Sequence, residues 1–248
     1  MSKKLSKSLT NQSCNKRRLL KKPLILLLIL VILIGVIIFT AYSLTQNVDL
    51  QMLTEQAISN NLAADTYCFS SKSVLHIGTE ERCFADLTGE KSGPRDRHIA
   101  GTLVGTEIDI FFVDGVLFRK DTISGSWSAL TVGELENAVN IMSELEPAMN
   151  FALESTGDVT DCGREKLDGK NCYVVSFMPV LQDEWIKTYF GNIRYKLWIS
   201  GRKEPQIIKA QIEGTSLENT DAGLTITLGY SDYNSSIILH TPVIKENR

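Results

Sequence analysis

The histidines and the closely spaced aspartates are the residues of this sequence that would carry acid–base or metal chemistry. His76, His98 and His240 each lie in a segment that alternates like a β-strand, and none has a second ligand at the spacing of a metal site. Asp109 and Asp114 are five residues apart in such a segment, so their side chains point to opposite faces and form no acid–base pair.

Sequence motifs of the common enzyme classes are also missing. No HExxH, G-x-S-x-G, Walker A or G-x-G-x-x-G pattern occurs in the 248 residues. The sequence therefore predicts a protein that is not an enzyme, with no catalytic residue, no metal and no cofactor.

Cysteines are the remaining reactive residues. Four follow the apolar segment described below: Cys68, Cys83, Cys162 and Cys172. An Asp168-Gly169 hairpin turn places Glu165 opposite Cys172, which leaves Cys162 about 10 Å away along the strand, beyond the reach of about 7 Å for a disulfide. We expect buried free thiols, which behave as small hydrophobic residues in a sheet, and a disulfide remains the alternative on an oxidising side of a membrane.

The hairpin between the segments 66–77 and 82–90 decides whether Cys83 can reach Cys68. If Ile77 lies opposite Arg82, Cys83 faces His76 and is some eight residues from Cys68, too far for a bridge. Cys14 lies on the other side of the apolar segment, where we expect it to be reduced.

Charge is distributed unevenly along the chain. The whole sequence has 26 basic and 29 acidic residues, a net charge of −3. Residues 1–22 contain eight basic residues and no acidic one, so residues 23–248 carry a net charge of −11. An acidic main domain disfavours nucleic acid as a partner, because phosphate binding depends on clustered Lys and Arg.

One segment is apolar for long enough to cross a membrane. From Leu24 to Ala41 almost every residue is apolar, which makes a helix of about 27 Å. The basic cluster precedes it, so the positive-inside rule predicts a cytoplasmic tail (1–22), a signal-anchor transmembrane helix (23–43) and an extracytoplasmic remainder. Cleavage after Ser43, as in a signal peptide, remains the alternative.

The sequence of the extracytoplasmic part predicts one α+β domain. Residues 44–65 form a helical connector, and residues 66–248 form the domain, with further helices over 131–145 and 180–190. Alternating strand segments are residues 66–77, 82–90, 97–104, 106–113, 116–120, 158–166, 171–178, 195–200, 206–213, 224–230 and 236–241. Strands in runs with interposed helices favour a long antiparallel sheet with helices on one face.

Several motifs in this order resemble a known group of proteins. They are the segment 111–118 (FFVDGVLF) before Trp127, the hairpin 163–175 (GREKLDGKNCYVV), the strand 196–199 (KLWI) and the segment 228–234 (LGYSDYN). Residues 55–243 resemble the LolA-like lipoprotein-carrier superfamily, in particular its LppX/LprG-type lipoprotein branch. The chain departs from that branch because it has no lipobox cysteine, and the transmembrane anchor takes the place of the lipid.

The resemblance implies a curved antiparallel half-barrel with helices packed on the concave face, around an apolar cavity for acyl chains. Choosing the more apolar side of each strand assigns the cavity face to Ile108, Ile110, Phe112, Tyr173, Val175, Phe177, Leu197, Ile199, Ile208, Ala210, Ile212, Leu224, Ile226 and Leu228. The helix over 131–145 contributes Val132, Leu135, Val139 and Met142.

Two functions follow from these expectations. The first is a membrane-anchored binding domain of the bacterial cell envelope that holds a lipid or an acylated ligand for local lipid or lipoprotein handling. The second is an envelope sensory or protein-interaction domain whose partner is another envelope protein and whose apolar residues make a packed core without ligand. The partners expected are thus the membrane, a lipid or an envelope protein.

Overall fold

The computed structural model describes residues 32–35, 48–130, 145–182 and 184–244, and the chain divides into two units, residues 1–48 and 49–248. Residues 32–35 of the first unit are helical. Among the residues described, no helix has the length and apolar character needed to cross a membrane. The predicted tail (1–22) and most of the predicted span (23–43) lie outside the described residues.

The second unit consists of thirteen described strands and three short helical segments. The helical segments are α3 (Leu50–Ala63), the 3-10 helix η2 (Pro147–Phe151) and α5 (Glu184–Tyr189). The first six strands are β1 (Thr66–Ile77), β2 (Glu80–Ser92), β3 (Asp96–Leu103), β4 (Thr106–Val113), β5 (Val116–Lys120) and β6 (Trp127–Leu130). The others are β7 (Leu153–Ser155), β8 (Thr160–Leu167), β9 (Lys170–Phe177), β10 (Val180–Leu181), β11 (Phe190–Ser200), β12 (Gln206–Ser216) and β13 (Ala222–Ser231).

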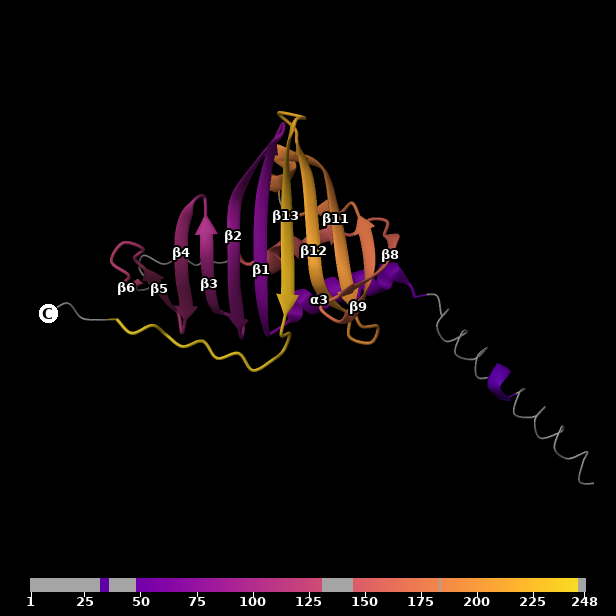
Figure 1. Ribbon diagram of the computed structural model, residues 1–248, viewed down its shortest axis with the longest axis horizontal. Coiled ribbons are helices and arrows are strands. Elements are labelled where there is room, and N and C mark those ends of the chain that lie inside the picture. Colours follow the sequence, from indigo (N-terminus) through magenta and orange to yellow (C-terminus); the bar gives the residue numbers. More distant parts are fainter. Residues whose placement is uncertain (1–31, 36–47, 131–144, 183, 245–248) are drawn as a thin grey trace, which may run out of the picture. The chain divides into compact units, whose positions relative to one another are not determined.

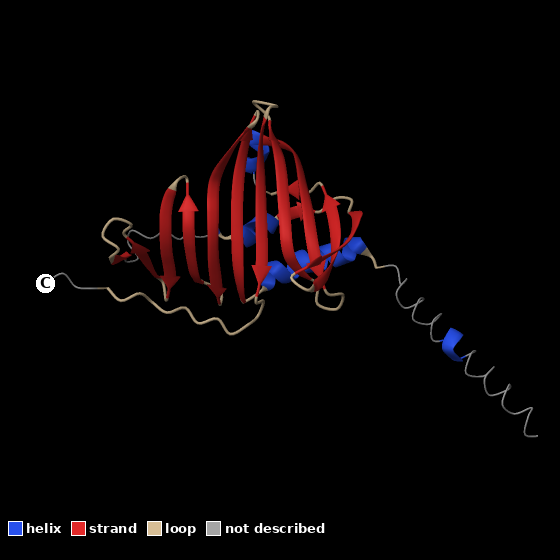
Figure 2. Cartoon of the chain, in the orientation of Figure 1, coloured by secondary structure: helices blue, strands red, loops and turns tan. Residues whose placement is uncertain are grey.

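Eleven of these strands form a single antiparallel sheet in the order β6-β5-β4-β3-β2-β1-β13-β12-β11-β9-β8, and β7 pairs with β10. The sheet is open, because its outermost strands β6 and β8 do not pair with each other. The first and last long strands, β1 and β13, are neighbours at its centre (Figure 1). The predicted antiparallel sheet with few helices is confirmed, and Figure 2 shows α3 lying across one face of it.

Local sequence explains the hairpins and the start of α3. Asp114-Gly115 and Asp168-Gly169 both have positive φ, as two-residue hairpin turns require (52° and 77°, 46° and 80°). Asp49 caps α3, and its carboxylate accepts a hydrogen bond from the backbone N–H of Met52 at 3.0 Å.

The predicted registers and elements hold in part. Glu165 does lie opposite Cys172, and all four cysteines after the apolar segment are free thiols, as predicted, but only Cys172 is buried, whereas Cys83 and Cys162 are exposed because their strand positions are not covered. The predicted β1–β2 register was wrong by two residues, because Ile77 pairs with Glu80 and the same register places Cys83 opposite Val74; a bulge follows between Val74 and Ser73. Residues 236–241 are not a strand, and the predicted helix over 131–145 lies outside the described residues up to position 144.

Candidate functional site

The sheet has two faces, which we call the inner face, on which α3 and η2 pack, and the open face. The ring of Phe151 in η2 contacts the rings of Tyr195 and Tyr230. From α3, Asn61 donates a hydrogen bond to the Tyr233 hydroxyl at 2.7 Å, and the Tyr233 ring stacks on Tyr230. Tyr195 in β11 and Tyr230 in β13 therefore point to the inner face.

Strand pairing extends the inner face from β9 to β13, because paired residues of antiparallel strands point to the same side. One row across the sheet is Phe177, Tyr195, Ile212 and Ile226, and the next is Val175, Leu197, Ala210 and Leu228. Tyr173 pairs with Ile199 one step further, and Leu224 alternates with Ile226. The structure brings all of these predicted residues to one face.

The other half of the sheet contributes three more predicted residues to this face. The row that contains Tyr230 continues through Phe69, Gly89, Ile99 and Ile110. Phe112 and Ile108 alternate with Ile110 along β4 and thus also point inward.

Ile208 is a correction, because it lies on the open face. Trp198 pairs with Lys209 but Ile199 pairs with Ile207, so β12 has one extra residue at this point. Ile208 packs instead with Cys172, Val174 and Trp198 in a small cluster on the open side. Ile207, which is fully buried, takes the inward position. The residues Val132, Leu135, Val139 and Met142 of the predicted helix lie outside the described residues.

Burial divides the inner face into a covered part and a partly exposed part. Val175, Leu197, Ile199 and Leu228 are all 0% exposed. By contrast, the inward side chains Ile108, Ile110, Leu224 and Ile226 are half-buried. The apolar surface thus continues beyond the fully buried part of the sheet.

Small residues, interrupted by the buried Leu87, occupy the inner face between these two groups of half-buried side chains. Ser73 pairs with Ile226 and with Ala85, and Gly101 pairs with Ile108. Gly101 has φ 139°, and a Cβ there would lie 2.1 Å from the carbonyl oxygen of Asp86. These residues were not predicted, because choosing the more apolar side of each strand overlooks small side chains. The signal available was the alternation of small residues in β1.

A charged cluster also lies on the inner face, at the end of the sheet where β1 begins. We call Tyr67, Lys91, Arg97 and Glu146 the Glu146 cluster. Glu146 accepts hydrogen bonds from the Tyr67 hydroxyl at 2.7 Å and from Arg97 Nε and Nη2 at 3.1 and 3.0 Å. The Lys91 ammonium lies 3.7 Å from Glu146 Oε1 and 5.4 Å from the centre of the Tyr67 ring. The sequence does not reveal this cluster, because its members come from three separate segments: Tyr67 from β1, Lys91 and Arg97 from the β2–β3 hairpin, and Glu146 from the residue before η2.

Burial controls the acid–base properties of this region. It raises the pKa of Tyr67 far above its ordinary value, and the neighbouring Glu146 carboxylate adds to the effect. Burial also raises the pKa values of Tyr230 and Tyr233. The Lys91 ammonium has a lowered pKa, chiefly because it is taken out of water, although Glu146 opposes the change.

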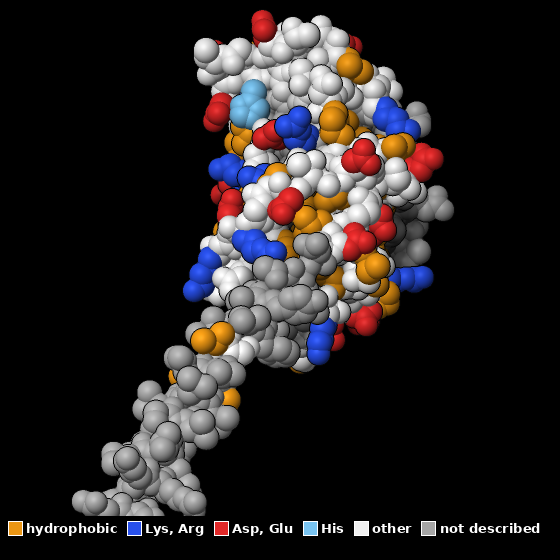
Figure 3. All heavy atoms as spheres, turned by 90° about the vertical axis from the view of Figure 1, so that its right-hand side faces the viewer, with side chains coloured by type: hydrophobic (Ala, Val, Ile, Leu, Met, Phe, Trp, Pro, Cys, Tyr) orange, Lys and Arg blue, Asp and Glu red, His pale blue; other side chains and the backbone are white. Residues whose placement is uncertain are grey.

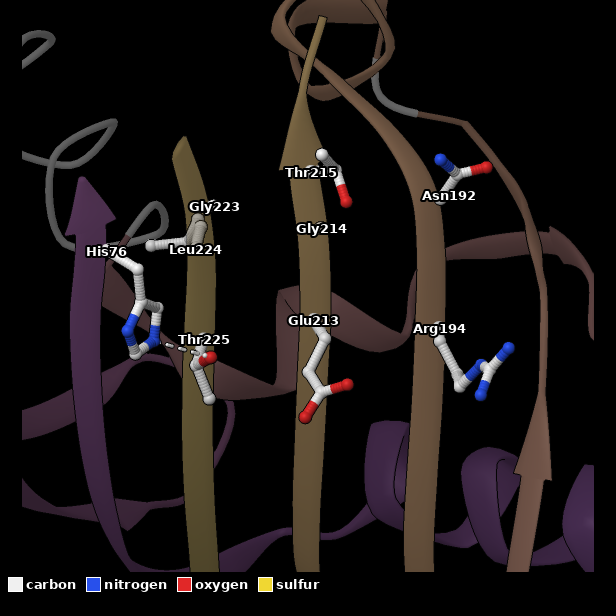
Figure 4. A pocket seen from close by; sticks show the side chains of 9 residues that line it. All are labelled: His76, Asn192, Arg194, Glu213, Gly214, Thr215, Gly223, Leu224 and Thr225. Carbon is white, nitrogen blue, oxygen red and sulfur yellow. Dashed lines mark hydrogen bonds between the residues drawn. The ribbon is translucent and has the colours of Figure 1, made fainter. Parts of the chain in front are cut away.

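The open face carries a polar hollow of about 230 Å³ where β1, β13, β12 and β11 lie side by side (Figure 4). His76 Nε2 lies 3.0 Å from Thr225 Oγ1 at one end of it. Glu213 and Arg194 are cross-strand partners, yet among the described residues no ion pair joins them, and in Figure 4 the guanidinium extends away from the carboxylate. This hollow is hydrophilic and differs from the apolar cavity that the resemblance implies.

Elsewhere the surface is mixed in character. On the side of the molecule that Figure 3 shows, acidic and apolar side chains are interspersed. Near the other edge of the sheet, the His98 ring stacks on Phe111 at 3.9 Å, and His98 Nε2 lies 3.0 Å from Asp109. No group of three or more potential metal ligands occurs within the described ranges.

Comparison with known proteins gives structural matches alone. No family model matches the sequence, and no curated protein matches it. The structure is similar to LprF from Mycobacterium bovis, with 12% identity and a TM-score of 0.49 over 77% of this chain and 96% of that one. It is also similar to the lipoprotein LppX from Mycobacterium tuberculosis, with 13% identity and a TM-score of 0.46 over 77% of this chain and 98% of that one.

A more distant match is a LolA superfamily protein from Nitrosomonas europaea, with 12% identity and a TM-score of 0.32 over 76% of this chain and 94% of that one. All three matches are similarities of structure at low sequence identity.

Proposed function

We propose that the inner face binds the acyl chain of a lipid or lipoprotein, within a curved half-barrel whose helices lie on the concave side. One observation carries the proposal. Half-buried apolar side chains, Ile226 and Leu224 on one side and Ile108 on the other, flank a strip of small residues that includes Ser73 and Gly101. Small side chains between larger apolar ones leave room for a narrow apolar ligand.

The energetics restrict the ligand to long chains. Each methylene removed from water contributes about 0.8 kcal/mol. Association costs on the order of 4–15 kcal/mol in lost freedom of motion. Some ten or more buried methylenes, roughly 8 kcal/mol, are therefore needed before binding becomes favourable. Fatty acids of six carbons should not bind, whereas those of eighteen should.

Calorimetry of the full chain in amphipol tests this proposal. Oleate should raise the melting temperature, because a ligand that binds only the native state stabilises it, and hexanoate should not. Ile226→Trp should remove the oleate effect by filling the space beside Ser73. Thr227→Trp is the matched control, since the neighbouring side chain points to the open face. Equal oleate shifts in the two variants would contradict the assignment of the ligand to the inner face.

We also propose that the chain is a single-pass membrane protein with residues 44–248 outside the cytoplasm. The eight basic residues before the apolar segment, with no acidic one, support this topology. Protease added to intact protoplasts should degrade the domain and leave the tail and span. Complete protection of the domain would refute the topology. An anchored domain would hand its ligand over locally rather than shuttle it across the envelope.

The second candidate function is an interaction or sensory domain with a packed interior. The polar hollow favours it, because Arg194 and Glu213 present unlike charges at an open surface without pairing with each other. Failure of all long-chain ligands to change the melting temperature, together with unfolding of the Ile226→Trp variant, would favour this function over lipid binding.

A further inference from the structure

The Glu146 cluster contains one more cation than carboxylate on the inner face. The side chains of Lys91, Arg97 and Glu146 are 10%, 9% and 13% exposed. Among the described residues, these two cations thus share one largely buried carboxylate, and the second carboxylate that acts on Lys91, that of Asp65, is exposed. Taking a charge out of water is costly unless an opposite charge or hydrogen bonds replace the water.

Every N–H donor of the Arg97 guanidinium has an acceptor. Its Nε and Nη2 donate to Glu146, Nη1 donates to the carbonyl oxygens of Gly93 and Asp96, and Nη2 also donates to that of Pro94. The guanidinium is therefore fixed in place by its own hairpin and by Glu146. It has no donor left for a ligand.

Lys91 is different. Its ammonium has three N–H donors, and within the described part of the chain its nearest anionic partner is Glu146 at 3.7 Å, which is longer than a hydrogen bond. The oxygens of Glu146 already accept from Tyr67 and Arg97. Asp65 also favours the charged ammonium, but the loss of water outweighs both carboxylates and lowers the pKa of Lys91.

The distance from Lys91 to Leu87 along the inner face is comparable to the length of an extended acyl chain. Lys91 and Leu87 both point inward from β2, and Leu87 pairs with Ser71 of the neighbouring strand. Four residues of strand separate them, a distance of about 13 Å. One leaflet of a bilayer has a hydrocarbon thickness of about 15 Å, so an extended long chain can reach from Leu87 to the ammonium.

We propose that Lys91 binds the anionic head group, a carboxylate or phosphate, of an amphiphile whose chain lies on the inner face. The anion would balance the second cation and accept the free N–H donors of Lys91. This inference rests on the proposed function, and it deepens it by naming the class of ligand as anionic amphiphiles rather than neutral lipids.

The test compares oleate with monoolein, a neutral lipid with the same chain, on the full chain in amphipol. Affinities are obtained from the shift in melting temperature over a range of ligand concentrations. The wild-type chain should bind oleate about ten-fold or more tightly than monoolein, since a charge-assisted hydrogen bond is worth at least that factor. Lys91→Met should remove the preference and keep the binding of monoolein.

Two further variants complete the test. Lys72→Met is the matched control, because Lys72 is 56% exposed on the open face beside Asp86, and it should leave the preference unchanged. Lys91→Arg keeps the positive charge and should keep the preference for oleate over monoolein. This variant is measured in place of Lys91→Met if Lys91→Met does not fold.

The outcomes separate this inference from the proposed function. If neither lipid stabilises the wild-type chain, the proposed function fails. If both lipids bind equally, or if Lys91→Met still prefers oleate, the assignment of Lys91 fails and lipid binding stands. If acetate or phosphate alone binds as tightly as oleate, the site takes a free anion, and the amphiphile is wrong. Binding of 1-oleoyl lysophosphatidate as well as oleate would extend the head group to phosphate.

Discussion

Ile207 and Ile208 are consecutive residues of β12, and both are buried, but on opposite faces of the sheet. Ile207 pairs with Ile199 on the inner face, whereas Ile208 packs with Trp198 and Val174 on the open side. Consecutive side chains of a strand alternate between the faces, and a β-bulge with one extra residue shifts that alternation, so Ile208 and Ala210, two residues apart, lie on opposite faces. The open side therefore has a small apolar cluster of its own, separate from the proposed ligand face.

Ile208→Ala should destabilise the domain without changing ligand binding. Removal of a buried Ile side chain costs about 2–5 kcal/mol of unfolding free energy, which urea denaturation measures. Ile208→Val should cost less, about 0.5–1.5 kcal/mol. The oleate shift should persist in both variants. Loss of the shift in Ile208→Ala, with little loss of stability, would return Ile208 to the inner face.

The buried tyrosines predict a loss of stability at alkaline pH. The pKa values of Tyr67, Tyr230 and Tyr233 are raised in the folded state, so these phenols keep their protons when the unfolded chain, with pKa values of about 10, loses them. Their contribution is complete below pH 10 and is lost as the pH rises above it. Each tyrosine lowers the unfolding free energy by up to about 1.4 kcal/mol per pH unit there.

Ultraviolet titration of tyrosinate checks this prediction. Of the seven tyrosines in the chain, these three should ionise only when the domain unfolds, in one step with the loss of β-sheet circular dichroism. Smooth ionisation of all seven tyrosines near pH 10 in the folded protein would contradict the prediction. It would show that water reaches the start of β1, where Tyr67 lies.

The four cysteines should react with maleimide in the order of their exposure. Cys83 and Cys162 are exposed and should react in the folded protein, whereas Cys172 is 1% exposed and should react only after unfolding. Burial also raises the pKa of the Cys172 thiol, which reduces its reactive thiolate. Mass spectrometry of the labelled, unreduced protein measures the order. A peptide pair linked through Cys162 and Cys172 would contradict it.

Gly101→Ala should be the most damaging of the glycine substitutions near the small-residue strip. A Cβ at Gly101 would overlap the carbonyl oxygen of Asp86, and φ of 139° is unfavourable for alanine. We expect a loss of about 2 kcal/mol or more in urea denaturation. Gly78→Ala is the control, because its φ is also positive but its Cβ would meet nothing, and it should cost about 1 kcal/mol.

Local patterns in the sequence determined much of the sheet. The Asp168-Gly169 turn set the register of β8 against β9 and placed Glu165 opposite Cys172, as predicted. Alternation of apolar residues placed most of the predicted cavity residues on one face, because a strand has a strict period of two. These features depend on residues that are close in sequence, so the amino-acid sequence alone is enough to predict them. Whether the face binds a ligand stays a prediction.

Tertiary structure alone decided the features that break this alternation or join distant segments. The bulge at Ile208 and the bulge in the β1–β2 pair between Val74 and Ser73 arise from the pairing of whole strands, for which no local residue gives a sign. Glu146 meets Lys91 and Arg97 across some fifty residues of sequence, and each of the three looks like an ordinary surface charge by itself. Only the folded sheet puts these charges on the inner face, where the loss of water gives them their importance.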